Sequence, residues 1–266
     1  MSEMENLIVV KKEPVCTLII NNPKRRNAFT RGCHASIARA LEELTEDKNI
    51  RVVIIRGAGE EAFSAGADII AMPERGSDTN AKPKVQDDST LISSEAIQKY
   101  PYPVIAMLYG FTLGAGCALA MACDIRIAST TVKMGIPTSR MGLLPSPQGF
   151  KRFLNAVGYS TAMEMFLTGR MYDSRDCLAM GMVNHLVEQD KLEEYTYQLA
   201  EDITRCAPLS LRNSKRILSR IAENPFLSVS EIELFEAMRK EASSSDDHEE
   251  AKKAFKEKRK PVFKGQ

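Results

Sequence analysis

The sequence predicts an α/β protein built from repeated units of strand, strand and helix. Short apolar runs rich in β-branched residues alternate with segments of helical spacing before about residue 135. Two of these runs, at residues 52–56 and 103–108, lead into turns rich in Gly, Ala and Ser. After residue 150 the pattern becomes mostly helical. Strands that alternate with helices pack in layers around one core, so we expect stacked ββα units followed by a helical region.

The N-terminal half is expected to contain strands at 7–10, 15–20, 52–56 and 103–108 and helices at about 30–47 and 89–99. The sequence KKEP between the first two strands is typical of a hairpin. The first helix has apolar residues at helical spacing, and Pro101 ends the second. Residues 21–30 and 72–88 are polar and contain prolines, so both are expected to be loops, the second mobile or closing over a pocket.

The C-terminal half is expected to contain short strands at 124–128, 131–134 and 182–187, with helices elsewhere beyond residue 150. Residues 135–149 are irregular and contain three prolines. Pro208 and Pro225 mark breaks between successive helices. The last helix ends in the basic sequence KEKRK, which by itself indicates a solvated face.

Composition limits the classes of function. The 266 residues are 44% hydrophobic with a net charge of +1, so a large core is available and a concentrated nucleic-acid-binding surface is not expected. No apolar run reaches eighteen residues and the chain does not begin like a signal peptide, so we expect a cytoplasmic protein without a membrane partner. The six cysteines and three histidines lack metal-ligand spacing, so free thiols are expected, with no metal.

The chain is organised around residues 110–124, GFTLGAGCALAMACD, which follow the apolar run at 103–108. A helix that begins after a glycine-rich turn exposes unpaired N–H groups and partial positive charge, and can hold an oxyanion there. Close packing of helix against strand would also explain the glycines. Because residue 119 is Leu, the spacing is not that of a dinucleotide-binding turn.

A second turn of the same kind occurs at residues 61–70, EAFSAGADII. Two such turns can each direct a main-chain N–H at one carbonyl oxygen, which is how an oxyanion hole is built. These two blocks, with NNPKRRNA at 21–28 and AFKEKRKPVF at 254–263, resemble the crotonase (enoyl-CoA hydratase/isomerase) superfamily. The resemblance extends from about Asn6 to the C-terminus.

The resemblance implies the crotonase (ClpP-like) α/β fold, with a core and CoA pocket in residues 1–200. Residues 201–266 would then form a C-terminal helical trimerisation region, giving a homotrimer or a dimer of trimers. It also implies an acyl-CoA substrate, with coenzyme A as part of that substrate and no other cofactor.

Site residues follow from the resemblance by motif position. The oxyanion-hole donors are the amides of Ala67 and Ala115, and Thr138 and Ser146 face the reacting end of the acyl group. Coenzyme A is expected to contact the basic triplet and the two turns, and Phe255 and Lys258 are expected to meet coenzyme A bound to a neighbouring subunit. The residues expected to bind coenzyme A on the two turns and the loop are Lys24, Arg25, Arg26, Ala28, Ala65, Asp68, Ile69 and Gly114.

The chain departs from the family at the acid/base positions. Typical hydratases carry glutamates where this chain has Ala118 and Thr138, so the two-glutamate hydration mechanism is not available at these positions. Ser146 stands where dienoyl-CoA isomerases carry an aspartate. Asp68 and Asp124 lie inside the motifs, but we expect structural roles for both, Asp68 as a helix cap.

Several reactions fit this pocket. A lyase of the enoyl- or dienoyl-CoA hydratase type is the first, because that chemistry dominates the family. Decarboxylation of a malonyl-type thioester also suits a pocket without a general base, and IQKYPYPVI at 97–105 and VNHLVE at 183–188 resemble the methylmalonyl-CoA decarboxylase branch. That branch has His where this chain has Ala67 and Tyr where it has Pro145. Isomerisation, thioester hydrolysis and a catalytically reduced CoA-binding subunit are the remaining alternatives.

Overall fold

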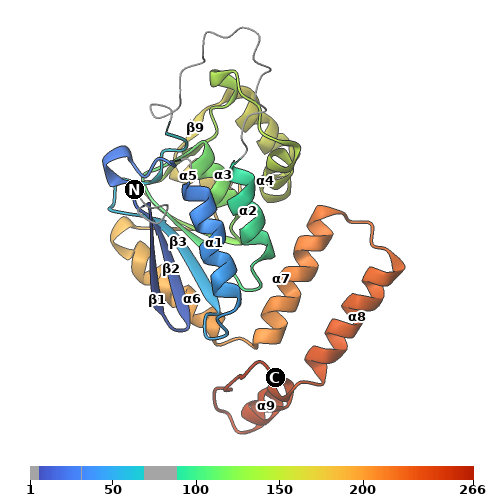
Figure 1. The fold of residues 1–266 in the computed structure, drawn as a ribbon. Helices are drawn as coiled ribbons and strands as arrows, with labels where there is room; N and C mark the ends of the chain where they lie inside the picture. Colours follow the sequence, from blue (N-terminus) through green and yellow to red (C-terminus); the bar gives the residue numbers. More distant parts are fainter. Residues whose placement is uncertain (1–5, 31, 69–88) are drawn as a thin grey trace.

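The computed structural model of the chain describes residues 6–30, 32–68 and 89–266. It contains one sheet of six strands and one of four, in the part of the molecule that holds the N-terminus (Figure 1). The larger has the order β1-β2-β3-β5-β7-β10, and the smaller has the order β4-β6-β8-β9. The strands of the larger sheet are β1 (Leu7–Lys12), β2 (Val15–Ile20), β3 (Val52–Gly57), β5 (Val104–Leu108), β7 (Ile125–Ser129) and β10 (His185–Val187). Those of the smaller sheet are β4 (Ala62–Ser64), β6 (Phe111–Leu113), β8 (Lys133–Gly135) and β9 (Met171–Tyr172).

The chain passes repeatedly from the larger sheet to the smaller one. β3 is followed by β4, β5 by β6 and β7 by β8, and each of these pairs precedes a helix. Within the larger sheet β1 is antiparallel to β2 and the other neighbours are parallel. The repeated ββα units expected from the sequence are therefore confirmed.

Helices cover both faces of the larger sheet. The helices of the described residues are α1 (Cys33–Thr45), α2 (Ser89–Lys99), α3 (Ala115–Ala122), α4 (Pro147–Thr168), α5 (Ser174–Ala179), α6 (Leu192–Thr204), α7 (Pro208–Glu223), α8 (Val229–Ser243) and α9 (Asp246–Lys256), with short 3-10 turns at η1 (Pro23–Arg25), η3 (Ser139–Met141) and η4 (Gln189–Lys191). β5 is buried on both faces, which explains its continuous apolar run. Alternate residues of β3 and β5 face α1 and α3 in one cluster and α6 in the other.

Some elements differ from the sequence prediction. Residues 111–113 were expected to belong to a turn, but they form β6 and pair with β4 and β8. β9 has only two residues and was not predicted. The strand expected at 182–187 is shorter, His185–Val187, and lies parallel to β7 at the edge of the larger sheet. The expected loop at 72–88 lies outside the described residues.

The helices α7, α8 and α9 lie to one side of the two sheets (Figure 1). The side chain of Lys215 in α7 is 8% exposed, and its Nζ donates to the main-chain oxygens of Ile97 and Tyr102 and to the carboxylate of Asp124. Three donors therefore meet three acceptors in a buried place, which offsets the cost of burying the charge. The expected structural role of Asp124 is confirmed by this contact, since the same carboxylate also accepts from the Val104 N–H.

Candidate functional site

The two glycine turns contact each other. Gly66 has a φ of 96° and Gly114 a φ of 52°, both in the region that favours glycine. A Cβ on Gly66 would lie 2.7 Å from the Leu113 oxygen and 3.4 Å from the Ala115 nitrogen. A side chain at this position would therefore separate the turns, so glycine is required both for its conformation and for the close approach.

The pairing of Ala67 with Phe29 sets the direction of the Ala67 N–H. The Phe29 N–H donates to the Gly66 oxygen over 2.7 Å, and the Asp68 N–H donates to the Phe29 oxygen over 3.0 Å. These two bonds form an isolated parallel bridge between Phe29 and Ala67. Because successive amides of an extended chain point to opposite edges, the Ala67 N–H points away from Phe29.

Ala115 is the first residue of α3, so its N–H has no partner within the helix. In the described part of the chain, neither the Ala67 N–H nor the Ala115 N–H donates to a protein acceptor. The N-terminus of α3 adds partial positive charge at this point. The arrangement thus provides two unengaged amide donors on turns that are in contact, in a place suited to an oxygen that carries negative charge.

The loop with the basic triplet lies against the Gly66 turn. Asn27 is buried at 1% exposure, and its amide donates to the main-chain oxygens of Ala58 and Ala62. It has a φ of 55°, which asparagine tolerates better than most residues. The Ala65 N–H donates to the Arg26 oxygen over 2.9 Å. Neither the buried role of Asn27 nor the pairing by Phe29 was expected, although an asparagine in a polar loop is a general signal for positive φ.

Two of the three basic residues in this loop contact acids of the second turn. Arg25 Nη1 lies 2.5 Å from Asp68 Oδ2, and the Asp68 side chain is only 6% exposed. Arg26 Nε lies 2.6 Å from Glu61 Oε1, and both of these side chains are more than half exposed. Lys24 is exposed. The helix that Asp68 was expected to cap lies outside the described residues, as does Ile69.

Ala28 is buried and its main chain is engaged. Its N–H donates to the main-chain oxygen of Arg25 over 3.0 Å, and its main-chain oxygen accepts from the side-chain amide of Asn22 over 2.9 Å. Ala65 is half-buried.

The polar side chains considered for the reacting end of the acyl group differ in their ability to take part in catalysis. Thr138 is half-buried just before η3. Ser146 is the N-cap of α4, and its hydroxyl accepts from the Gly149 N–H over 3.2 Å, so its own proton remains available for donation. Cys117 in α3 is fully buried, and burial raises the pKa of its thiol to about 12. A thiol with such a pKa is not a nucleophile at neutral pH.

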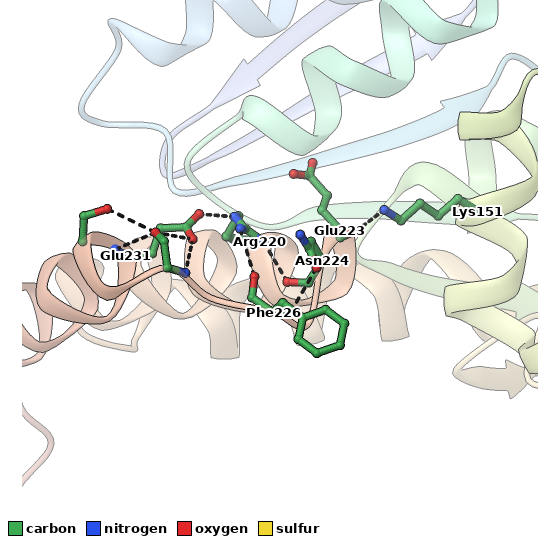
Figure 2. A network of polar contacts seen from close by, with 8 residues as sticks. Lys151, Arg220, Glu223, Asn224, Phe226 and Glu231 are labelled. Atoms are coloured by element: carbon green, nitrogen blue, oxygen red, sulfur yellow. Dashed lines mark hydrogen bonds and ion pairs between the residues drawn. The ribbon is translucent and has the colours of Figure 1, made fainter.

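A cavity of about 510 Å³ lies between α2, α4 and α7. Gln148 lines it from the start of α4, and Glu95 lines it from α2. Figure 2 shows Lys151 of α4 donating to the main-chain oxygen of Glu223 at the end of α7. The cavity is lined mainly by charged and amide side chains.

Phe255 and Lys258 lie far from the two turns within the chain. Phe255 is in the last turn of α9 and is 86% exposed, and Lys258 follows that helix. In Figure 1, α9 lies at the lower end of the molecule, and α3 lies within the upper part. A single chain therefore does not bring these two residues to the Ala67 and Ala115 amides.

The described residues contain no group of three or more His, Cys, Asp or Glu placed to hold a metal ion. The six cysteines are free thiols, as the sequence predicted. Among the helices in the described ranges, none combines the length and the apolar character needed to cross a membrane.

Residues 10–266 match the profile of the family described as enoyl-CoA hydratase/isomerase. The chain belongs to the enoyl-CoA hydratase/isomerase family. It is 33% identical over 262 residues to a short-chain-enoyl-CoA hydratase of Clostridium acetobutylicum. This match covers 97% of each chain. It is 31% identical over 261 residues to a methylmalonyl-CoA decarboxylase of Escherichia coli, covering 98% of this chain and 97% of the relative.

Solved structures of the enoyl-CoA hydratase/isomerase family share this fold. The structure of an enoyl-CoA hydratase/carnithine racemase from Magnetospirillum magneticum has a TM-score of 0.87 and 31% identity, covering 99% of this chain and 97% of the other. The crotonase fold and the superfamily predicted from the sequence motifs are therefore confirmed. Because the relatives include both a hydratase and a decarboxylase, family membership leaves the reaction open.

Proposed function

We propose that this chain binds an acyl-CoA thioester and stabilises the enolate formed from it, most simply as an atypical enoyl- or dienoyl-CoA hydratase-type lyase. The observation that carries the proposal is the contact between the turns at Gly66 and Gly114, where the amides of Ala67 and Ala115 donate to no acceptor among the described residues. A thioester oxygen bound by both amides would gain negative charge as the enolate develops. Each such donor contributes about 3 kcal/mol to transition-state stabilisation.

Hydration needs a proton relay other than two glutamates, because residues 118 and 138 are Ala and Thr. The Ser146 hydroxyl retains a proton to donate, and Thr138 is half-buried beside η3, so these two hydroxyls are the groups assigned to that relay. A bound water between them and the substrate would complete it.

Decarboxylation of a malonyl-type thioester is the second candidate. Loss of CO₂ leaves both electrons of the broken bond on the α-carbon, and the enolate forms without removal of a proton by the enzyme. The reaction therefore needs the two amides more than it needs a base, which suits a chain with Ala118 and Thr138. The relationship to a methylmalonyl-CoA decarboxylase, at 31% identity, supports this alternative.

Coenzyme A is assigned to the outer surface where the basic loop meets the second turn, with Lys24, Arg25 and Arg26 near its phosphates. We assign no metal and no separate cofactor. We also propose a cytoplasmic location.

A homotrimer or a dimer of trimers is proposed, with residues 1–200 as the core and residues 201–266 making the contacts between subunits. The exposed apolar side chains of α7, α8 and their connection support this assignment, since such surface is normally covered. They are Leu218, Ile221, Phe226, Val229, Ile232 and Leu234. Phe255 and Lys258 would then reach coenzyme A on a neighbouring subunit.

One experiment separates the candidate reactions. Purified protein is incubated with enoyl-, dienoyl- and malonyl-type CoA thioesters, and the products are followed by mass. A gain of one water identifies a hydratase, loss of CO₂ a decarboxylase, and free coenzyme A a thioesterase, while isomerisation is followed by its absorbance spectrum. Binding of thioesters without turnover would identify a CoA-binding subunit, and failure to bind any thioester would contradict the proposed function.

A further inference from the structure

A buried carboxylate directly follows the proposed oxyanion donor. Asp68 is adjacent to Ala67, its side chain is 6% exposed, and its Oδ2 lies 2.5 Å from Arg25 Nη1. A carboxylate taken out of water is costly unless it is paired. The guanidinium of Arg25, at 47% exposure, is therefore a structural partner of the second turn and not only a surface charge.

This ion pair joins the same segments as the main-chain bridge at Phe29. The Phe29 N–H donates to the Gly66 oxygen over 2.7 Å, and the Asp68 N–H donates to the Phe29 oxygen over 3.0 Å. Both the main chain and the side chain of Asp68 thus tie the turn to residues 25–29. The direction of the Ala67 N–H depends on this attachment, because its neighbours on both sides are the bonded groups.

We propose that Asp68 is a positioning residue, and that its ion pair with Arg25 holds the Ala67 N–H in the direction needed to donate to the substrate oxygen. This inference rests on the proposed function of the Ala67 amide. It reassigns Asp68 and Arg25, which the family resemblance placed against coenzyme A. An Arg25 guanidinium that is held by Asp68 contributes to the rate of reaction, while Lys24 and Arg26 are left to contact the coenzyme A phosphates.

The two roles for Arg25 predict different measurements. If Arg25 contacts phosphate, its loss weakens binding of coenzyme A and leaves the bound thioester unchanged. If it positions Asp68, its loss changes kcat and leaves binding nearly unchanged, because a displacement of about 1 Å in a donor can cost about 100-fold in rate. The same displacement would weaken the hydrogen bonds to the thioester carbonyl.

The test uses Asp68→Asn, Arg25→Met, Arg25→Lys and the double variant Asp68→Asn with Arg25→Met. The matched control is Glu61→Gln, which breaks the ion pair with Arg26 between the same loop and turn, but with both side chains exposed. Infrared spectroscopy of bound butyryl-CoA with a ¹³C-labelled carbonyl measures the shift of the thioester stretch. Butyryl-CoA has no double bond to hydrate, so this readout needs no turnover.

We expect Asp68→Asn and Arg25→Met each to lower kcat by about 10- to 100-fold and to reduce the carbonyl shift, while the Kd for butyryl-CoA changes by less than about threefold. Arg25→Lys should restore part of the kcat and part of the carbonyl shift. The double variant should cost less than the sum of the two single variants, because the two residues share a contact. Glu61→Gln should keep the kcat and the carbonyl shift of the wild-type protein.

Circular dichroism and thermal unfolding establish that each variant is folded. If either single variant does not fold, the double variant still tests the inference, because it removes both charges and leaves no buried carboxylate without its Arg25 partner. Weaker binding by Arg25→Met with an unchanged kcat and carbonyl shift would overturn the inference. If wild-type protein does not bind butyryl-CoA, or binds it with no carbonyl shift, the proposed function itself fails and this inference with it.

Discussion

Replacement of Gly66 by Ala tests whether the contact between the two turns is needed for activity. The new methyl group would lie 2.7 Å from the Leu113 oxygen and 3.4 Å from the Ala115 nitrogen. Contacts below about 3 Å are not tolerated by main-chain atoms, so the turns must move apart. A non-glycine residue at a φ of 96° adds about 1–3 kcal/mol of backbone strain.

The expected cost is larger for activity than for stability. We expect Gly66→Ala to lower the free energy of unfolding by about 2 kcal/mol, mainly through backbone strain. Displacement of the Ala67 and Ala115 amides should lower kcat by about 100-fold or more, which is the effect of losing one oxyanion donor. Urea unfolding measures the first quantity, and turnover of the thioester identified by the mass experiment measures the second.

Gly59→Ala is the matched control. Gly59 also has a positive φ, of 71°, but a Cβ there would have no atom within 4 Å. It should therefore lose about 1 kcal/mol of stability through strain alone and keep a kcat within about twofold of wild type. If Gly66→Ala retains wild-type kcat, or if both variants lose activity equally, the contact between the turns has no catalytic role.

Three further predictions concern residues outside this contact. Lys215→Met should lower the free energy of unfolding by about 3 kcal/mol, because it leaves the Asp124 carboxylate and two main-chain oxygens without their buried donor. Urea titration measures this change, and an unchanged unfolding midpoint would contradict the structural role of Lys215. At pH 8 a thiol reagent should modify exposed Cys206 rapidly and buried Cys117 only after unfolding. The Cys117 pKa of about 12 leaves about one thiolate in 10⁴ at this pH. Equal rates of modification for the two thiols would refute the burial of Cys117. Lys24→Met should weaken binding of coenzyme A by about three- to tenfold at low salt, with little effect on kcat. Calorimetry measures the affinity, and an unchanged affinity would show that Lys24 does not contact the phosphates.

The sequence predicted the repeating units because their signals are local. The apolar run at β5 and the helical spacing of α1 depend only on neighbouring residues, and both elements were found within a few residues of their expected bounds. β6 was missed because a three-residue strand between glycines has too few residues to show a period. Its pairing partners β4 and β8 lie far away in the sequence.

The candidate site was predicted in its motifs but not in its contacts. The two turns were recognised from composition and family resemblance, and the structure brings them together at Gly66 and Ala115. The ion pair between Arg25 and Asp68 joins residues 43 positions apart, so no local pattern indicates it. Nor does composition distinguish a basic side chain held by a buried acid from one left free in solvent, as the contrast between Arg25 and Lys24 illustrates.

The roles of the Ala67 and Ala115 amides can be tested directly by a crystal structure of the protein with bound butyryl-CoA. The proposed function predicts that the thioester oxygen lies about 2.7–3.1 Å from both main-chain nitrogens, with the coenzyme A phosphates near the basic loop. A thioester oxygen that contacts neither amide, in a protein that turns over the corresponding enoyl- or malonyl-type thioester, would contradict the account.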